Sequence, residues 1–185
     1  MRDPALKPKS RLFFLLTAVI SIGFGVLLFV GLSQSPKDIQ SALIGKKAAN
    51  FTIKLIQGKD LDSDQDGRLS LSELAGQNVI INFWASWCVS CRQEAVDFQK
   101  FYLMDHKTDV TLVGIAIQDT MEDARQFAGV HGKTYALGLD DSGNTGIDYG
   151  VTGVPETFWI NRQGTIIEKF AGPLTTEMLI EKMKL

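Results

Sequence analysis

The sequence predicts an α/β fold, in which a central mixed β-sheet is flanked by helices, joined to an N-terminal transmembrane helix. Two observations lead to this prediction. From about residue 51 onward, short β-prone apolar runs alternate with amphipathic runs, and such alternation is typical of parallel strands joined by helical crossovers. Before them, residues 12–32 form an uncharged apolar run of about the length that spans a bilayer.

The composition indicates one globular domain with a short appendage. The chain has 185 residues, of which 45% are hydrophobic, and a formal net charge of −2. Because there is no basic excess, nucleic acid is not an expected partner. Both cysteines lie in one motif, so no disulfide framework holds the fold together.

The N-terminal residues indicate a membrane anchor. Residues 1–11 carry four basic residues and one acidic residue, and the positive-inside rule places such a segment in the cytoplasm. Residues 12–32 are then the anchor, residues 33–45 a linker, and residues 46–185 a domain on the far side of the membrane. The alternative is a cleaved signal peptide with a cut near Ser33, but its apolar core would normally be shorter.

Residues 62–73 match the calcium loop of EF-hand proteins at every ligand position. The candidate ligands are Asp62, Asp64, Asp66, the carbonyl of Arg68, Ser70 and Glu73. The flanks differ from an EF-hand, because an expected edge strand at residues 51–56 precedes the loop and only a brief helical turn follows it. The motif predicts a Ca²⁺ site that stiffens the edge of the domain, and the alternative is a solvated acidic turn. No cofactor is expected to be required.

A predicted strand, turn and helix carry the two cysteines. The apolar run at residues 79–83 precedes W-C-V-S-C at residues 87–91, and an amphipathic run follows. A thiolate at a helix N-terminus is stabilised by free backbone N–H groups and by the helix dipole. The two-residue spacer lets the second sulfur resolve a mixed disulfide. We therefore predict that Cys88 is the nucleophile and Cys91 the resolving thiol.

Two other roles for the cysteine pair are half of a zinc site and a static structural disulfide. Zinc requires four ligands, and the two histidines are too far apart in the sequence to complete the set. The tryptophan before the pair and the strand–helix junction argue against a static disulfide. Redox chemistry is the favoured interpretation.

Together, N-F-W-A at residues 82–85 and W-C-V-S-C resemble the thioredoxin superfamily. The chain is most similar to its membrane-anchored branch, the TlpA, ResA and CcmG (DsbE) proteins. Residues 150–158, G-V-T-G-V-P-E-T-F, are a second match. The resemblance implies a thioredoxin-like fold and a cis peptide bond between Val154 and Pro155, packed against the dithiol.

The resemblance also implies roles for residues around the dithiol. Asn82 stands where thioredoxin has a buried Asp, and Glu94 matches an acid that would raise the pKa of the thiols and carry the proton of Cys91. The alternative for Glu94 is an exposed acid in the first helical turn.

Three further residues are candidates for contact with a substrate. These are Trp87, Val154, whose backbone would pair with an extended chain, and Glu156. Glu156 would contact the partner or help to set the thiol pKa, and its alternative is an exposed acid at the start of a strand.

The implied function is thiol–disulfide exchange on the periplasmic side of the bacterial inner membrane. Proteins of the CcmG branch are reductants that keep the haem-attachment thiols of apocytochrome c reduced, directly or through a maturation partner. Their electrons come from a membrane thiol reductase of the DsbD or CcdA type. A TlpA- or ResA-like reductant of another client, such as a copper-site protein, is one alternative. A calcium-stiffened binding module with a non-catalytic dithiol is another. A DsbA-like oxidase is not favoured, because the spacer at residues 89–90 holds no His.

Overall fold

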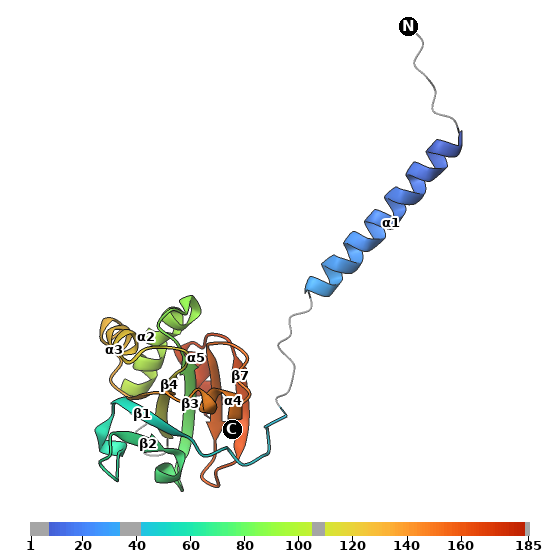
Figure 1. Ribbon diagram of the computed structural model, residues 1–185. Coiled ribbons are helices and arrows are strands. Elements are labelled where there is room, and N and C mark those ends of the chain that lie inside the picture. Colours follow the sequence, from blue (N-terminus) through green and yellow to red (C-terminus); the bar gives the residue numbers. More distant parts are fainter. Residues whose placement is uncertain (1–7, 34–41, 105–109, 184–185) are drawn as a thin grey trace. The chain divides into compact units, whose positions relative to one another are not determined.

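The computed structural model describes residues 8–33, 42–104 and 110–183. The chain divides into two compact units, residues 1–39 and 40–185. The first contains helix α1 (Pro8–Ser33), and the second contains the sheet and all other helices described (Figure 1). The predicted N-terminal segment 1–11 and linker 33–45 lie mainly outside the described residues, so these boundaries stay predictions.

Side chains of α1 are described for residues 13–29, and the large apolar ones among them are exposed. Within the described part of the chain, no helix has the length and apolar character needed to cross a membrane. The predicted transmembrane helix at residues 12–32 therefore stays a prediction.

A seven-stranded mixed sheet forms the centre of the second unit, as predicted, with the strand order β2-β1-β5-β4-β3-β6-β7. The strands β3, β4 and β5 are parallel, and the pairs outside them are antiparallel. The bounds are β1 (Thr52–Gln57), β2 (Arg68–Ser70), β3 (Asn78–Trp84), β4 (Val110–Ala116), β5 (Ala136–Leu139), β6 (Glu156–Ile160) and β7 (Ile166–Ala171).

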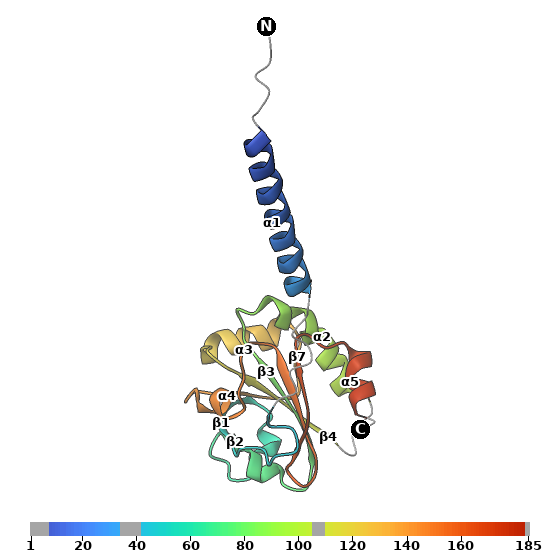
Figure 2. The same cartoon turned by 90° about the vertical axis from the view of Figure 1, so that its right-hand side faces the viewer.

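The helices of this unit cover the sheet unequally. Helices α2 (Val89–Leu103), α3 (Met121–Val130) and α5 (Thr176–Lys182) bury their apolar side chains on one face, in a cluster that contains Phe98, Phe127 and Leu179. Figure 2 shows α2 beside α5. The other face is covered by the short α4 (Asn144–Asp148), the 3₁₀ turn η3 (Leu71–Leu74) and the segment before β1. A second 3₁₀ turn, η2 (Lys59–Leu61), follows β1.

Side-chain caps determine where the helices begin. The hydroxyl of Thr120 accepts the N–H of Asp123 at the start of α3, and Thr175 accepts the N–H of Met178 at the start of α5. With these caps, α3 begins at Met121 and α5 at Thr176. The amphipathic run after the two cysteines forms α2, which ends at Leu103.

The predicted strand at residues 51–56 is confirmed as β1 (Thr52–Gln57), but its predicted place at the edge of the sheet is wrong. Strand β2 pairs with β1 in antiparallel register, with Ile53 opposite Leu69, and is itself the edge of the sheet. Leu69 is fully buried in the second apolar cluster, which explains why this short strand docks. A strand of three residues has too few positions for its alternation to be recognised in the sequence.

Candidate active site

Cys88 and Cys91 form a disulfide at the N-terminus of α2. Cys88 is the N-cap residue, and its Sγ accepts the backbone N–H of Cys91 at 3.1 Å. Cys88 is 5% exposed and Cys91 is 1% exposed. The pair therefore lies at the predicted strand–helix junction, with Cys88 the more accessible sulfur, while the roles of nucleophile and resolving thiol stay predictions.

The loop before the disulfide is held by the loop between β4 and α3. The carboxylate of Asp119 accepts the N–H and the hydroxyl of Ser86, at 2.6 and 2.8 Å. The indole N–H of Trp87 is bonded to the carbonyl of Gln118, although the ring itself is exposed. An open groove of about 820 Å³ begins at Trp87 and is lined by Asp119 and Asp140, so an acidic surface lies beside the dithiol.

A second loop, before β6, contacts the disulfide. The peptide bond between Val154 and Pro155 is cis, as predicted. The carbonyl oxygen of Val154 lies 3.5 Å from Cys88 Sγ. The segment at residues 150–158 is thus in contact with the W-C-V-S-C motif.

Glu156 points into the protein. Its Oε1 accepts the N–H and the hydroxyl of Thr152, and its Oε2 lies 2.8 Å from Lys169 Nζ, which also donates to the carbonyl of Gly150. Glu156 is buried, so the alternative of an exposed acid is wrong. The contacts fasten both ends of the loop that presents Val154.

Glu94 is buried one helical turn after Cys91, with only 2% of its surface exposed. Its carboxylate accepts the side-chain N–H of Asn82 at 2.9 Å and the backbone N–H of Leu174 at 3.1 Å. Burial raises the pKa of Glu94 to about 7, against the opposing effect of these hydrogen bonds and of Lys133. The alternative of an exposed first-turn acid is wrong.

Lys133 is a further buried charged residue, and no sequence pattern indicates it. Lys133, in the loop between α3 and β5, is 5% exposed, and its Nζ lies 4.0 Å from the centroid of the Trp84 ring. Burial lowers the pKa of Lys133 to about 7, while Glu94 acts in the opposite direction. Lys133 stands outside the predicted strand, where a lysine ordinarily faces solvent.

Comparison with known proteins identifies the group to which this arrangement belongs. The model of the AhpC/TSA family matches residues 44–169, which is most of the chain. The chain belongs to this family. The thiol:disulfide interchange protein DsbE of Allochromatium vinosum is 33% identical over 166 residues, covering 89% of this chain and 87% of that protein. HelX of Rhodobacter capsulatus, also a thiol:disulfide interchange protein, is 33% identical over 174 residues, covering 93% of each chain.

Solved structures of relatives have the same fold. StoA of Bacillus subtilis superposes with a TM-score of 0.62 at 29% identity, covering 74% of this chain and 97% of StoA. The predicted thioredoxin-like fold is therefore confirmed. As a member of the AhpC/TSA family with DsbE and HelX as relatives, the chain is a thiol–disulfide oxidoreductase that uses a C-x-x-C pair.

In the predicted calcium loop, backbone N–H groups donate hydrogen bonds to the carboxylates that were expected to bind the ion. The carboxylate of Asp62 accepts the N–H groups of Asp66 and Gly67, and Glu73 accepts those of Ser63 and Ser70. These hydrogen bonds lower the pKa of Glu73. No group of three or more Cys, His, Asp or Glu in the described ranges is arranged to hold a metal ion. Calcium binding stays a prediction, which a calorimetric titration with CaCl₂ would test.

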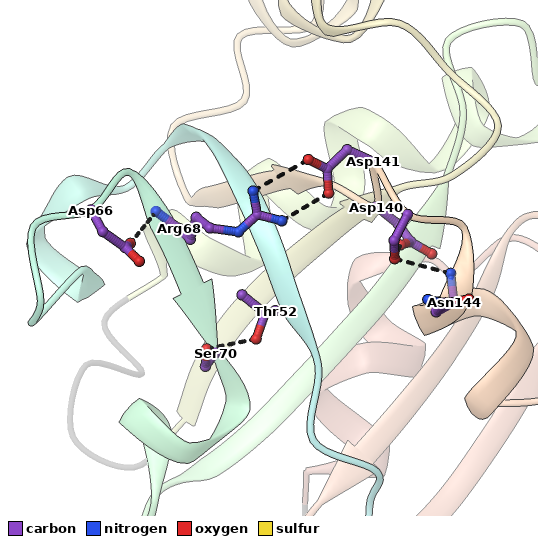
Figure 3. A network of polar contacts seen from close by, with 8 residues as sticks. Thr52, Asp66, Arg68, Ser70, Asp140, Asp141 and Asn144 are labelled. Atoms are coloured by element: carbon purple, nitrogen blue, oxygen red, sulfur yellow. Dashed lines mark hydrogen bonds and ion pairs between the residues drawn. The ribbon is translucent and has the colours of Figure 1, made fainter.

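The same loop is tied to the neighbouring part of the sheet. In Figure 3, Arg68 extends from β2 to the carboxylate of Asp141 after β5, with a closest distance of 2.9 Å, and its own N–H is bonded to Asp66. Asp64 is exposed, and its backbone N–H is bonded to the carboxylate of Glu73. The predicted ligands are thus spread over the loop before β2, β2 itself and η3, and the carboxylates of Asp62, Asp66 and Glu73 accept different backbone N–H groups.

Proposed function

We propose that the chain is a reductant that keeps the haem-attachment thiols of apocytochrome c reduced during cytochrome c maturation. The observation that carries the proposal is the buried carboxyl group of Glu94 one turn from Cys91. A dithiol becomes a strong oxidant when its environment stabilises the reduced, thiolate form. A buried carboxylate disfavours a nearby thiolate, so it favours the disulfide state and makes the dithiol give up its electrons.

The reaction follows from the positions of the two sulfurs. In the reduced protein, the Cys88 thiolate attacks a disulfide of the client, the client S–S bond breaks, and one client thiolate leaves. Cys91 then loses its proton to the Glu94 carboxylate and attacks Cys88 Sγ. The mixed disulfide breaks, the second client thiolate leaves, and two electrons have passed from the protein to the client.

The cis-proline loop supplies the client site in this proposal. Val154 presents its backbone next to Cys88, and an extended client segment would pair with it. The exposed Trp87 would cover the other side of the segment. Glu156 acts through the loop that it fastens rather than through direct contact with the client.

The proposed client and electron donor rest on the resemblance to the CcmG branch. A membrane thiol reductase of the DsbD or CcdA type would reduce the Cys88–Cys91 disulfide after each cycle. The proposed location is the periplasmic side of the bacterial inner membrane, with residues 12–32 as the anchor. The basic residues before position 12 and the exposed apolar side chains of residues 13–29 support it. An anchor raises the effective concentration of weak exchange partners at the membrane.

The test is disulfide exchange with a C-x-x-C-H peptide that carries an internal disulfide. The reduced full-length protein is expected to reduce this peptide faster than a C-x-x-C peptide from a copper-site protein. A Cys91→Ser variant is expected to accumulate the mixed disulfide through Cys88, and a Cys88→Ser variant to accumulate none. Equal rates for both peptides would argue for another client, and net oxidation of the reduced haem-site peptide would overturn the proposal.

A further inference from the structure

The segment between β7 and α5 contacts the loop that precedes β6. The backbone N–H of Gly172 donates to the carbonyl of Pro155 at 2.9 Å, which continues the pairing of β6 with β7 beyond the ends of both strands. Pro155 follows Val154, whose own carbonyl lies 3.5 Å from Cys88 Sγ. The first contact of the segment therefore holds the backbone that faces the disulfide.

Two residues later, the same segment contacts the helix that carries the cysteines. The N–H of Leu174 donates to Glu94 Oε2 at 3.1 Å, and Leu174 is buried in the apolar cluster that contains both cysteines. At the start of α5, the N–H and the hydroxyl of Thr176 donate to Asp97 Oδ1 at 3.2 and 2.7 Å. Three alternate residues of one short segment thus bind the loop before β6 and helix α2.

The backbone of this segment has little freedom to adjust. Gly172 has a φ of +119°, a conformation that residues with a side chain rarely adopt. The next residue, Pro173, has a fixed φ and no N–H. Because both residues restrict the backbone, the N–H groups of Gly172 and Leu174 keep a fixed spacing.

We propose that Gly172 and Leu174 are positioning residues for thiol–disulfide exchange: through their backbone N–H groups, one stiff segment holds the client-pairing loop and the carboxylate of Glu94 in fixed places relative to the dithiol. Gly172 acts on client pairing through Pro155, and Leu174 acts on proton acceptance through Glu94. A hydrogen bond to a carboxylate favours its ionised form, so Leu174 keeps Glu94 able to accept the proton of the resolving thiol. The inference rests on the proposed client pairing and proton transfer, but not on the identity of the client.

Two substitutions separate the N–H of Leu174 from its side chain. Leu174→Pro removes the N–H, whereas the matched control Leu174→Ala keeps it and removes the buried apolar side chain. The measurement is an NMR titration of the Glu94 carboxyl carbon in the reduced full-length protein. Leu174→Pro is expected to raise the pKa of Glu94 by about one unit, because burial then acts without this opposing hydrogen bond. Leu174→Ala is expected to leave this pKa nearly unchanged, and equal values in the two variants would overturn the role of Leu174.

A second pair of variants keeps the proposal testable if Leu174→Pro does not fold. Gly172→Ala places a side chain where φ is +119° and is expected to displace the backbone around Pro155. The matched control is Gly76→Ala, in an exposed turn before β3, where φ is +82° and an added Cβ meets no atom within 4 Å. Both substitutions strain the backbone at a positive φ, but only Gly172→Ala lies in the segment.

The kinetic readout for this pair compares two kinds of disulfide. An extended peptide disulfide pairs with the backbone at Val154, whereas a small aromatic disulfide reaches Cys88 without that pairing. Gly172→Ala is expected to raise the KM for the peptide about fivefold, the effect of one lost hydrogen bond, and to leave the KM for the small disulfide nearly unchanged. Gly76→Ala is expected to change neither KM.

A purely structural role of Gly172 would impair exchange with both disulfides alike, and that result would overturn the proposal. An unchanged KM for the peptide in Gly172→Ala would also overturn it. The comparison uses any extended peptide disulfide, so its failure is distinct from failure of the proposed reductant function, which the reduction potential of the dithiol reports.

Discussion

Glu94 on α2 accepts a hydrogen bond of 2.9 Å from the side chain of Asn82 on β3, in the interior beneath the disulfide. The contact joins the helix that carries the cysteines to the central strand. Asn82 also donates to Thr157 on β6, next to the cis-proline loop. One amide thus connects the dithiol helix, the central strand and the strand that follows Pro155.

Substitution of Glu94 by Gln is expected to change how stability depends on pH. Because the pKa of Glu94 is raised from 4.5 to about 7 in the folded protein, the native state binds this proton more tightly than the unfolded state does. The stabilisation is fully present below pH 4.5 and is lost as the pH rises through about 7. Between those limits, the free energy of unfolding of the unaltered protein is expected to fall by at most about 3 kcal/mol.

Urea unfolding of Glu94→Gln at pH 5 and pH 7.5 measures this effect. The decrease between the two values is expected to be much smaller than in the unaltered protein. Glu177→Gln is the control, because Glu177 is an exposed acid in the first turn of α5. If Glu94→Gln and Glu177→Gln lose stability alike between pH 5 and pH 7.5, the raised pKa is wrong.

Substitution of Lys169 by Met is expected to destabilise the protein strongly. It leaves the buried carboxylate of Glu156 without the cation that lies 2.8 Å away. Removing one partner of a buried pair typically costs about 3 kcal/mol, because the other charge stays buried and uncompensated. In urea unfolding at pH 7, the double variant Lys169→Met/Glu156→Gln is expected to recover part of the loss. A Lys169→Met variant as stable as the unaltered protein would contradict the stabilising role of the Lys169–Glu156 ion pair.

Substitution of Arg68 by Met is expected to have little effect, in contrast to that of Lys169. The side chains of Arg68 and Asp141 are 37% and 36% exposed, and exposed pairs of this kind contribute at most about 0.5 kcal/mol. The measurement is urea unfolding at low and at moderate salt, where the small difference should shrink further with salt. A loss as large as that of Lys169→Met would show that the ion pair holds β2 in place.

Substitution of Asp119 by Ala is expected to slow disulfide exchange more than it destabilises the fold. It removes both bonds to Ser86 and thereby loosens the loop that carries Trp87. Iodide quenching reports this loop, because Trp87 is the exposed tryptophan while Trp84 and Trp159 are buried. We expect more quenching and a roughly tenfold lower rate with a small aromatic disulfide, from misplacement of the attacking sulfur. The control is Asp123→Ala, which leaves the bonds between Asp119 and Ser86 intact. Equal exchange rates in the two variants would contradict the proposed role of Asp119 in positioning the loop.

The dithiol and its cis-proline partner could be predicted because their chemistry depends on local motifs. W-C-V-S-C follows an apolar run, and G-V-P-E-T stands at the start of another, so both loops are placed at strand ends by hydrophobic pattern alone. Glu94 was also predicted, since it lies on the same helix as Cys91. The hydrophobic pattern does not indicate that Glu94 is buried or that it accepts hydrogen bonds from Asn82 and Leu174.

The features that were missed depend on contacts between distant segments. Lys133 is buried because Trp84 and Phe127, from β3 and α3, enclose it. Asp119 holds Ser86 only because β4 and β3 are neighbours in the sheet. Strand β2 exists because Leu69 reaches an apolar cluster built by other strands. Neither residue type nor periodicity indicates such contacts in advance.

The most direct test of the reductant function is the reduction potential of the Cys88–Cys91 pair, obtained by equilibrating the full-length protein with thiol redox buffers at pH 7. We expect a value near or below that of thioredoxin, about −270 mV, because the buried Glu94 disfavours the thiolate form. A value near about −120 mV, that of a strong oxidant, would contradict the account and would assign the chain to disulfide formation.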